Sequence, residues 1–408
     1  MRKIFDPVHG FIVLNDLESA LVDTEPFQRL RYIRQLGSAY LVYPGATHTR
    51  FEHSLGTMEL ATRIFDRIAL SEESATWLPA PAYARQIVRF AALCHDLGHL
   101  PFSHLAEQLV LGKEGHERWT VSMIQSEMLN TVWLELKERF PNHDVKADLI
   151  KLAVGETKLH QLGMRADFLK WHQALGQIIA GDFFGADRID YLLRDARFTG
   201  VSYGMFDYHQ LIEMVRILPS TDTNRLEMGI EEGAIEACEA LLLARHFMHR
   251  RVYQYDSVKG HAFHIARFIA AVLGENFSTT SLKNYLTWTD NEILTLMRAA
   301  QTNPEAIGYE EAICIADRSR RFRAVKIQDV PLEVLQAIAA TLPEEALFWE
   351  IGHKKKAIEQ AFPVLKRRGE IVPSTNVLQV ILPSHPSTWL YVDPRFFKEV
   401  EAKLSQYI

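Results

Sequence analysis

The sequence predicts a mainly α-helical protein with a small β-hairpin in its core and a smaller α+β lobe toward its C-terminal end. Three observations support this fold class. Apolar residues recur at intervals of three and four through much of the first 280 residues, two short apolar runs flank a turn-rich stretch at 219–224, and beyond about residue 280 helical pieces alternate with β-like runs. A chain of 408 residues suits a large domain at 1–280 and a smaller lobe at 281–408.

The individual elements follow from the same patterns. Short extended pieces are predicted over residues 1–24, where Asp6-Pro7 and Gly10 favour turns. Helices are predicted at 26–36, at 51–68, at 84–95, within 145–195 and at 233–255. Pro26 suits the first turn of its helix and Gly37 suits the end. The hairpin strands are predicted at 215–218 and 225–230, and the β-like runs of the lobe at 312–315, 324–327 and 377–382.

Composition narrows the class of protein. The chain is 48% hydrophobic and 24% charged, which is typical of a soluble globular protein, and its net charge of -6 argues against a surface that coats nucleic acid. Cys94, Cys238 and Cys314 lie far apart without a paired spacing, as expected in a reducing cytoplasm. No apolar run is long enough to span a membrane, and the N-terminal residues lack the apolar stretch of a signal peptide.

The most informative feature is the dipeptide His95-Asp96, which directly follows a strongly apolar predicted helix. An imidazole nitrogen and a carboxylate oxygen suit a divalent metal, and charged groups at a buried helix end need a partner or a metal. His53, on the preceding predicted helix, and Asp187, in Gly185-Ala-Asp-Arg-Ile-Asp-Tyr, are candidates to complete such a site. A His-Asp dipeptide alone is more often a surface pair or a structural hydrogen bond, so spacing alone leaves both alternatives open.

Three blocks of the sequence resemble the signature blocks of the HD-domain phosphohydrolases. They are Arg50-Phe-Glu-His53-Ser-Leu-Gly, His95-Asp-Leu-Gly-His-Leu-Pro-Phe-Ser-His104 and Ala186-Asp-Arg-Ile-Asp-Tyr191. The chain is most similar to the deoxynucleoside triphosphate triphosphohydrolase branch, which includes a vertebrate enzyme with a sterile-alpha-motif and bacterial relatives. The resemblance covers roughly residues 1–280, and in the C-terminal lobe it is loose, at 315–323.

This resemblance implies a metal centre and a catalytic cluster. The four metal ligands would be His53, His95, Asp96 and Asp187. His99 would contact phosphate, and His116 would be the catalytic histidine, with Glu107 beside it. The vertebrate enzyme has an aspartate at the position of Glu107, so the carboxylate here is kept on a side chain with a longer reach.

The resemblance also implies a substrate site and a regulatory site. The substrate-binding positions would be Gln35, Arg50, Tyr191, Asp195, Arg245, His249 and Tyr253. The last three are spaced by four and share a helix face, where an Arg suits phosphate and a Tyr can pack against a sugar. Asp23, Gln28 and Arg31 match contact positions of an activating guanine-nucleotide site at a subunit interface, although the same residues could simply begin a helix.

The implied activity is hydrolysis of a deoxynucleoside triphosphate to a deoxynucleoside and inorganic triphosphate. One divalent transition metal (iron, manganese, zinc or nickel) would occupy the HD site, and Mg²⁺ would accompany the substrate phosphates. His116 would move a proton to the leaving 5′-oxygen, with Glu107 holding its tautomer. The implied partners are the deoxynucleotide substrate, a guanine-nucleotide or deoxynucleotide activator, and further copies of the chain in a dimer or tetramer.

Two alternatives remain at this stage. Other HD proteins act on nucleoside monophosphates, cyclic nucleotides or hyperphosphorylated guanosine nucleotides; the last group carries a Glu-Asp pair where this chain has Leu97-Gly98-His99. The second alternative is a non-catalytic nucleotide sensor or a nucleic-acid-binding protein, to which the basic runs 354–356 and 366–368 would contribute. The acidic total charge and the intact ligand set argue against this second alternative.

Overall fold

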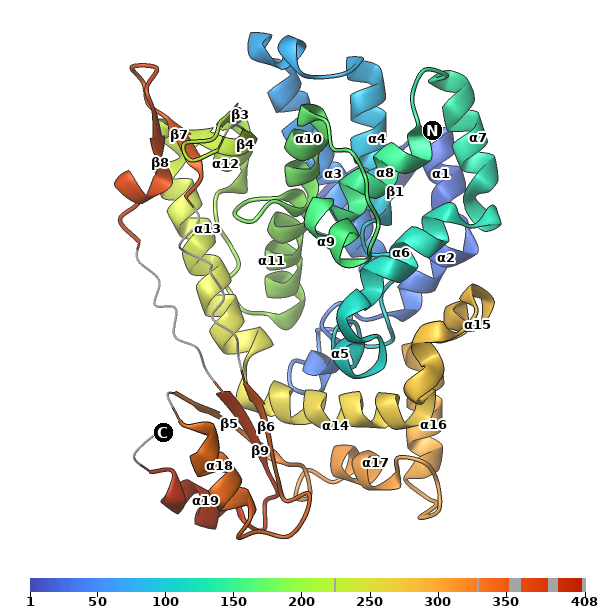
Figure 1. Cartoon of the computed structure of the whole chain (residues 1–408), viewed down its shortest axis with the longest axis vertical. Coiled ribbons are helices and arrows are strands. Elements are labelled where there is room, and N and C mark those ends of the chain that lie inside the picture. Colours follow the sequence, from blue (N-terminus) through green and yellow to red (C-terminus); the bar gives the residue numbers. More distant parts are fainter. Residues whose placement is uncertain (224, 329, 352–360, 381–387, 406–408) are drawn as a thin grey trace.

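The structure is a computed structural model of the whole chain, and it describes residues 1–223, 225–328, 330–351, 361–380 and 388–405. As the sequence predicts, the protein is mainly helical, with small sheets and an α+β region toward the C-terminal end (Figure 1). No helix in these residues is both long enough and apolar enough to cross a lipid bilayer.

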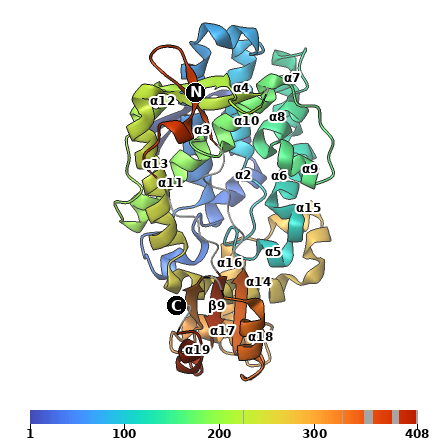
Figure 2. The same cartoon turned by 60° about the vertical axis from the view of Figure 1, so that its left-hand side comes forward.

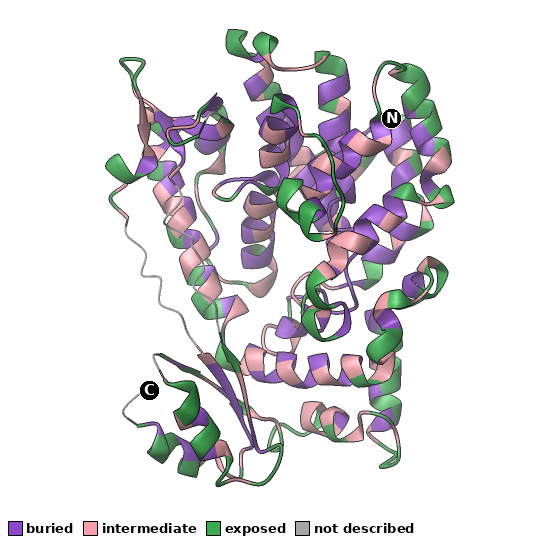
Figure 3. Ribbon diagram, viewed as in Figure 1, coloured by how far each residue is buried: buried purple, intermediate pink, exposed green. Residues whose placement is uncertain are grey.

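The centre of the molecule is a layer of packed helices whose inward faces are buried (Figure 3). Its main elements are α3 (Arg50–Ala69), α4 (Pro81–Cys94), α8 (Val145–Val154), α10 (Lys170–Ala180) and α11 (Ala186–Thr199). Further helices flank this layer: α5 (Glu107–Val110), α6 (Gly115–Gln125), α7 (Asn130–Arg139), α9 (Glu156–Gln161) and α12 (Tyr208–Glu213). The predictions for 51–68, 84–95 and 145–195 are therefore confirmed.

Helix α3 begins where the sequence supplies a capping box. The backbone N–H of Thr49 donates to Glu52 Oε1 at 2.9 Å, which satisfies a group at the helix start that has no partner within the helix. Helix α4 begins with Pro81, whose missing N–H costs nothing in the first turn. These two starts fix where each helix delivers its ligand, His53 one turn into α3 and His95 at the end of α4.

The N-terminal segment differs from its prediction in two places. Residues 1–24 form the hairpin β1 (Arg2–Asp6) and β2 (Gly10–Leu14), but they also contain a short helix, α1 (Asp16–Val22). The predicted helix 26–36 is wrong beyond its first turns, because α2 (Glu25–Arg29) passes into a 3-10 turn and ends. The backbone beyond it pairs with distant parts of the chain: the N–H of Arg34 donates to Asp290 Oδ2, and the N–H of Gln35 donates to His48 O.

The predicted hairpin 215–230 is confirmed as β3 (Val215–Pro219) and β4 (Leu226–Glu231). It belongs to a four-stranded sheet in the order β3-β4-β7-β8, in which β7 (Pro363–Leu365) runs parallel to β4, and β8 (Ile371–Pro373) pairs with β7. Late residues of the chain thus return to the first part of the molecule. The division of the chain at residue 280 stays a prediction.

The predicted helix 233–255 is α13 (Ile235–Met248), which continues into one π-helical turn, His249–Tyr253. It is followed by α14 (Asp256–Leu273), which crosses the molecule between the helical layer and a separate three-stranded sheet (Figures 1 and 2). After α14 the chain forms α15 (Leu282–Leu286), α16 (Asp290–Ala300) and α17 (Tyr309–Ala316), and α17 packs against α14.

The three-stranded sheet has the order β5-β9-β6, from β5 (Arg323–Ile327), β9 (Thr388–Val392) and β6 (Leu347–Ile351). Helices α18 (Leu332–Ala339) and α19 (Phe397–Lys403) share a small apolar core with this sheet. The predicted strand 324–327 is confirmed. The predicted strand 312–315 is wrong: it lies in α17, where Ala312 is fully buried and Glu311 bonds to His264 and Arg267 of α14.

The other C-terminal predictions have mixed outcomes. Residues 377–380 form no strand, and 381–382 lie outside the described residues. The basic run 354–356 also lies outside them, whereas 366–368 lies at the turn between β7 and β8. A large cavity of about 3450 Å³ separates the helical layer from α13, α14 and the three-stranded sheet, and it is lined by residues from all of them.

Candidate functional site

Three predicted metal ligands from three different helices converge beside this cavity. His53 of α3, His95 at the end of α4 and Asp187 of α11 each offer one ligand atom within 4.8 Å of the others. Asp187 Oδ1 lies 3.1 Å from His53 Nε2 and 3.7 Å from His95 Nε2. The fourth predicted ligand, Asp96, has Oδ2 3.4 Å from His53 Nε2 and Oδ1 3.4 Å from His95 Nε2. The structure thus brings together all four residues.

The two imidazoles are turned so that their Nε2 atoms face this centre. His53 Nδ1 lies 2.7 Å from Asp190 Oδ2, and His95 Nδ1 lies 2.7 Å from the carbonyl oxygen of Ala92. Each Nδ1 therefore carries the proton, which leaves the lone pair on Nε2. Both Nε2 atoms are buried and have no hydrogen-bond partner among the described residues. Two such nitrogens with two carboxylates fit a divalent transition metal.

Asp190 was not among the residues predicted from the sequence. It is fully buried and accepts hydrogen bonds from Arg194 Nε and Nη2, each at 2.9 Å. His9 Nε2 lies 2.6 Å from Asp190 Oδ1. Burial alone would raise the pKa of Asp190, but Arg194 and the bond with His53 hold it well below its ordinary value. Its spacing of three from Asp187, on one side of a helix, was the available sequence signal.

A glycine allows α3 and α11 to approach closely enough for these contacts. A Cβ atom at Gly56 would lie 2.0 Å from Asp190 Oδ1 and 2.4 Å from Arg194 Nη2. Gly56 lies one turn beyond His53, so its lack of a side chain lets the carboxylate of Asp190 reach the imidazole.

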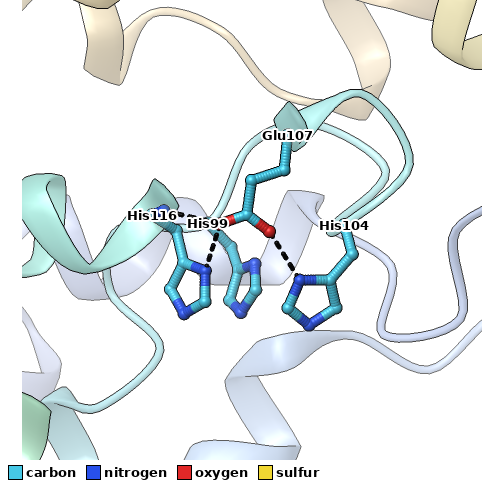
Figure 4. Close-up of side chains that lie close together, drawn as sticks. All are labelled: His99, His104, Glu107 and His116. Carbon is cyan, nitrogen blue, oxygen red and sulfur yellow. Dashed lines mark hydrogen bonds and ion pairs between the residues drawn. The ribbon is translucent and has the colours of Figure 1, made fainter. Parts of the chain in front are cut away.

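A second cluster contains the predicted catalytic residues His99, Glu107 and His116, together with His104 (Figure 4). Glu107 Oε1 lies 2.6 Å from His116 Nδ1, and Glu107 Oε2 lies 2.6 Å from His104 Nδ1. The rings of His99 and His116 stack with centroids 3.7 Å apart. Burial alone would raise the pKa of Glu107, but the two imidazoles hold it well below its ordinary value. One carboxylate therefore orients two histidines.

His104 was missed as a site residue, although it ends one of the signature blocks and lies three residues before Glu107. In the structure His104 and His116 contact opposite oxygens of the Glu107 carboxylate at the same distance. His99 has a different environment: burial and the guanidinium of Arg50 lower its pKa well below the ordinary value, so its ring is neutral at pH 7.

The loop between α4 and α5, which carries members of both clusters, is tightly constrained. Gly98 lies against α6, where a Cβ atom would meet the carbonyl oxygen of His116 at 2.1 Å. Arg50, predicted to bind substrate, donates through Nε to Ser103 Oγ at 2.8 Å and through Nη1 to Asp96. Arg50 thus connects the start of α3 to the loop and to a metal ligand, and it also lines the cavity.

The other predicted substrate-binding residues also line this cavity. They are Gln35, Tyr191, Asp195, Arg245, His249 and Tyr253. Tyr253 donates its hydroxyl to Asp195 Oδ2 at 2.8 Å, and His48 Nε2 lies 2.7 Å from Asp195 Oδ1. His48, which was not predicted, is buried and stacks on Phe198. The carboxylate of Asp195 is therefore fixed from both sides.

Arg188 is a further residue that sequence reasoning missed. Its buried Nε and Nη1 atoms have no hydrogen-bond partner among the described residues. Burial and the positive charge of Arg188 both lower the pKa of Arg245. Two guanidinium groups beside the predicted substrate residues favour an anionic ligand.

The predicted regulatory residues Asp23, Gln28 and Arg31 are not among the residues that line the cavity. Asp23 Oδ1 accepts from Arg2 Nη1 at 2.6 Å, and Gln28 Oε1 accepts from Arg31 Nε at 2.8 Å. The guanidinium of Arg31 lies 3.5 Å from the ring centroid of Phe51. These contacts give each side chain a partner within the chain.

Comparison with known protein families agrees with this geometry. A model described as the HD domain matches residues 50–171, and a model described as the HD-associated region matches residues 206–343. The first match contains three of the four predicted metal ligands, and Asp187 lies between the two matches.

Curated relatives match just under two thirds of the chain. An uncharacterised protein of Methanocaldococcus jannaschii is 35% identical over 259 residues, which is 64% of this chain and 47% of the relative. An uncharacterised protein of Bacillus subtilis is 35% identical over 62% of this chain and 52% of its own length. The deoxynucleoside triphosphate triphosphohydrolase SAMHD1 of Gallus gallus is 33% identical over 62% of this chain and 43% of its own length. The chain matches about half the length of these relatives.

One solved structure is similar over the whole chain. The crystal structure of a hypothetical protein from Aquifex aeolicus has a TM-score of 0.77 and 28% sequence identity, and the match covers 99% of both chains. The C-terminal elements therefore have a counterpart of known structure. With its two domain matches in order, its SAMHD1 relatives and its His-Asp centre, the chain belongs to the HD-domain phosphohydrolase family.

Proposed function

We propose that this protein hydrolyses deoxynucleoside triphosphates to deoxynucleosides and inorganic triphosphate, using a metal held by His53, His95, Asp96 and Asp187. The observation that carries the proposal is the meeting of two clusters at one cavity: the four predicted ligands, and the Glu107 pair of histidines beside them. The SAMHD1 relatives, which are deoxynucleoside triphosphate triphosphohydrolases at 31–33% identity, support the choice of substrate.

The metal, when bound, would polarise a phosphoryl oxygen or lower the pKa of a water molecule. The protein's own residues supply the remaining chemistry. Glu107 accepts hydrogen bonds from the Nδ1–H groups of His104 and His116. These bonds fix both tautomers and direct each Nε2 away from the carboxylate. A protonated His116 would donate from Nε2 to the leaving 5′-oxygen, and a neutral His99 would hydrogen-bond a phosphate oxygen.

Other residues at or near the cavity would bind the rest of the nucleotide. Arg188 and Arg245 would bind phosphate oxygens through their planar donor groups. Asp195, fixed by His48 and Tyr253, would accept a hydrogen bond from a sugar hydroxyl. The Tyr253 ring would pack against the sugar and disfavour a 2′-hydroxyl at that position. Asp23, Gln28 and Arg31 would bind an activating nucleotide outside the cavity.

Product analysis tests this proposal directly. Purified protein is incubated with each of the four deoxynucleoside triphosphates, with Mg²⁺ and Mn²⁺, and with or without guanosine triphosphate, and the products are separated by chromatography. The expected products are a deoxynucleoside and intact triphosphate, and an Asp187→Ala variant should form neither. Release of monophosphate or pyrophosphate would contradict the proposed reaction, and turnover of monophosphates or cyclic nucleotides alone would replace the substrate class.

A further inference from the structure

We propose that Asp290, in the HD-associated region, is a positioning residue that holds the catalytic loop 98–103 and, through Ser103 and Arg50, the metal-ligand carboxylate of Asp96. The inference rests on the proposed function, because it assigns a role within the same site. Asp290 begins α16 and lies far outside the HD-domain match at residues 50–171. Neither the sequence pattern nor the family matches assign it a role.

The loop needs an external support because of its backbone conformation. Phe102 and Ser103 are consecutive non-glycine residues with φ values of 57° and 59°. This left-handed region is unfavourable for residues with a Cβ atom, and it persists only where surrounding contacts enforce it. Asp290 Oδ1 accepts the backbone N–H of Phe102 at 2.7 Å, directly at this turn.

The second oxygen of Asp290 connects the loop to another segment. Asp290 Oδ2 accepts the backbone N–H of Arg34 at 3.0 Å and Arg34 Nη1 at 3.2 Å. Ser103 Oγ in turn donates to the carbonyl oxygen of Arg34 at 2.6 Å. Asp290 therefore fixes both Phe102 and the acceptor to which Ser103 is bonded.

Ser103 passes this constraint to the metal centre. Its Oγ also accepts Arg50 Nε at 2.8 Å, and Arg50 Nη1 donates to Asp96 Oδ2. The exposed fractions along this path are 1% for Asp290, 3% for Ser103, 3% for Arg50 and 5% for Asp96. Water cannot replace a lost partner at such positions without rearrangement, so each bond restricts the next.

Residues close to Asp290 also hold the loop at two positions before Phe102. Tyr285 donates its hydroxyl to the carbonyl oxygen of Gly98. Arg29 Nη1 donates to the carbonyl oxygen of His99 at 2.9 Å, while Arg29 Nε and Nη2 donate to the carbonyl oxygen of Trp288. Tyr285 of α15, Arg29 of α2 and Asp290 of α16 thus hold the loop at Gly98, His99 and Phe102, respectively. Asp290 is the one of these three residues that lies on the path to Asp96.

The test measures metal affinity first, because that readout needs no substrate. Asp290→Ala, Asp290→Asn and wild-type protein are titrated with Mn²⁺ against a chelator, and kcat and KM are measured separately. Loss of a group that orients a metal ligand typically lowers affinity or activity about 10–100-fold, and we expect Asp290→Ala to fall in this range. Asp290→Asn keeps one acceptor oxygen and nearly the same side-chain volume, so its metal affinity should fall between that of wild type and that of Asp290→Ala.

Glu292→Ala is the matched control. Glu292 Oε2 accepts the backbone N–H of Thr289 at 2.8 Å, so this variant weakens the start of the same helix without removing a bond to the loop. Its metal affinity should equal that of wild type. A double variant, Asp290→Ala with Ser103→Ala, should bind metal no more weakly than Ser103→Ala alone, because both changes interrupt one path.

The outcomes separate this inference from the proposed function. Wild-type metal affinity in both Asp290 variants would overturn the inference, and so would an equal loss in Glu292→Ala with a parallel fall in melting temperature. If Asp290→Ala does not fold, Asp290→Asn decides between these outcomes. A wild-type protein that binds metal but hydrolyses no triphosphate would refute the proposed function, while the affinity series would still decide the role of Asp290.

Discussion

The orientation of each imidazole in this site is determined by the partner of its second nitrogen. Asp190 serves His53, and Glu107 serves both His104 and His116. A carboxylate in this position fixes the tautomer and raises the basicity of the opposite nitrogen. The two aspartates of α11 consequently have different roles: Asp187 faces the metal centre, whereas Asp190 lies behind His53.

This difference predicts different results for two substitutions three residues apart. Asp187→Ala should abolish metal binding and leave the apo protein folded, because the side chain of Asp187 contacts the two ligand histidines, His53 and His95. Asp190→Ala should also weaken metal binding, but it leaves the buried Arg194 with Asp6 as its remaining acid, at a cost of about 3–5 kcal/mol in stability. Metal analysis and chemical unfolding of the chelated proteins measure both effects. Equal stability of the two variants would contradict the assignment.

Glu107 allows a test of chemistry without loss of metal. Glu107→Ala should lower kcat by about 10–100-fold, because His104 and His116 lose the acceptor that fixes their tautomers. Metal content should match that of wild type, since Glu107 bonds no predicted ligand. Steady-state kinetics with metal analysis of the same sample provide the measurement. An unchanged kcat would exclude Glu107 from the mechanism.

Most of the residues that the structure brings together here were predicted from the sequence, because they lie in recognisable blocks. Sequence reasoning did not identify Asp190, His48 or Arg188, although each lies within three residues of a predicted site residue. Their roles depend on where a side chain points and on what lies opposite it, and neither is encoded in local spacing. His104 was missed for a related reason, since one carboxylate with two imidazole partners is visible only in three dimensions.

At the scale of elements, the close contact of α3 with α11 decides whether the ligands meet. Gly56→Ala should destabilise the protein by about 1–3 kcal/mol or more, because the new methyl group would overlap Asp190 and Arg194, which are themselves paired. The matched control is Gly176→Ala in α10, where nothing lies within 4 Å of the added Cβ atom. That change should stabilise the helix by about 0.5–1 kcal/mol.

Chemical unfolding and metal titration of both variants check this prediction. Gly56→Ala should lose metal affinity together with stability, whereas Gly176→Ala should keep the affinity of wild type. Similar changes in the two variants would show that the contact between α3 and α11 tolerates a side chain.

The elements predicted correctly are those in which a local pattern and the tertiary contacts agree. Helices 51–68 and 84–95 have continuous apolar faces, and both are confirmed. The segment 26–36 has the same spacing, yet it leaves the helix because backbone groups of Arg34 and Gln35 bond to Asp290 and His48. The run 312–315 has the composition of a strand and packs as a helix against α14 instead. Distant partners decided both cases.

At the scale of the whole molecule, the cavity belongs to both parts of the chain. Residues of the HD domain, of α13 and α14, and of the three-stranded sheet all line it. The return of β7 and β8 to the hairpin of the first part adds a second connection. No local pattern predicts such a closure, because parallel pairing of β4 with β7 joins strands more than 130 residues apart. The contact of Asp290 with the loop is a third long-range connection.

This last connection predicts a dependence of stability on pH. Burial raises the pKa of Asp290 from 3.8 to about 6, and the backbone N–H groups of Phe102 and Arg34 oppose this rise. Between these two values the folded protein holds a proton that the unfolded chain has released. The contribution of Asp290 to the free energy of unfolding is therefore largest below about pH 4 and falls as the pH rises to about 6. Above that pH the contribution is constant. The difference corresponds to about 3 kcal/mol, since one pH unit is worth about 1.4 kcal/mol.

Asp290→Asn cannot titrate, so comparison with wild type isolates the effect. The free energy of unfolding of both proteins is measured in urea at several pH values from 4 to 7.5, with chelator present so that metal binding does not contribute. The advantage of wild type over the variant should decrease by about 2 kcal/mol between pH 4 and pH 6.5 and then level off. A constant difference across the range would show that Asp290 is ionised in the folded protein throughout, with Arg34 and the two backbone groups sufficient to hold its charge between the two parts of the molecule.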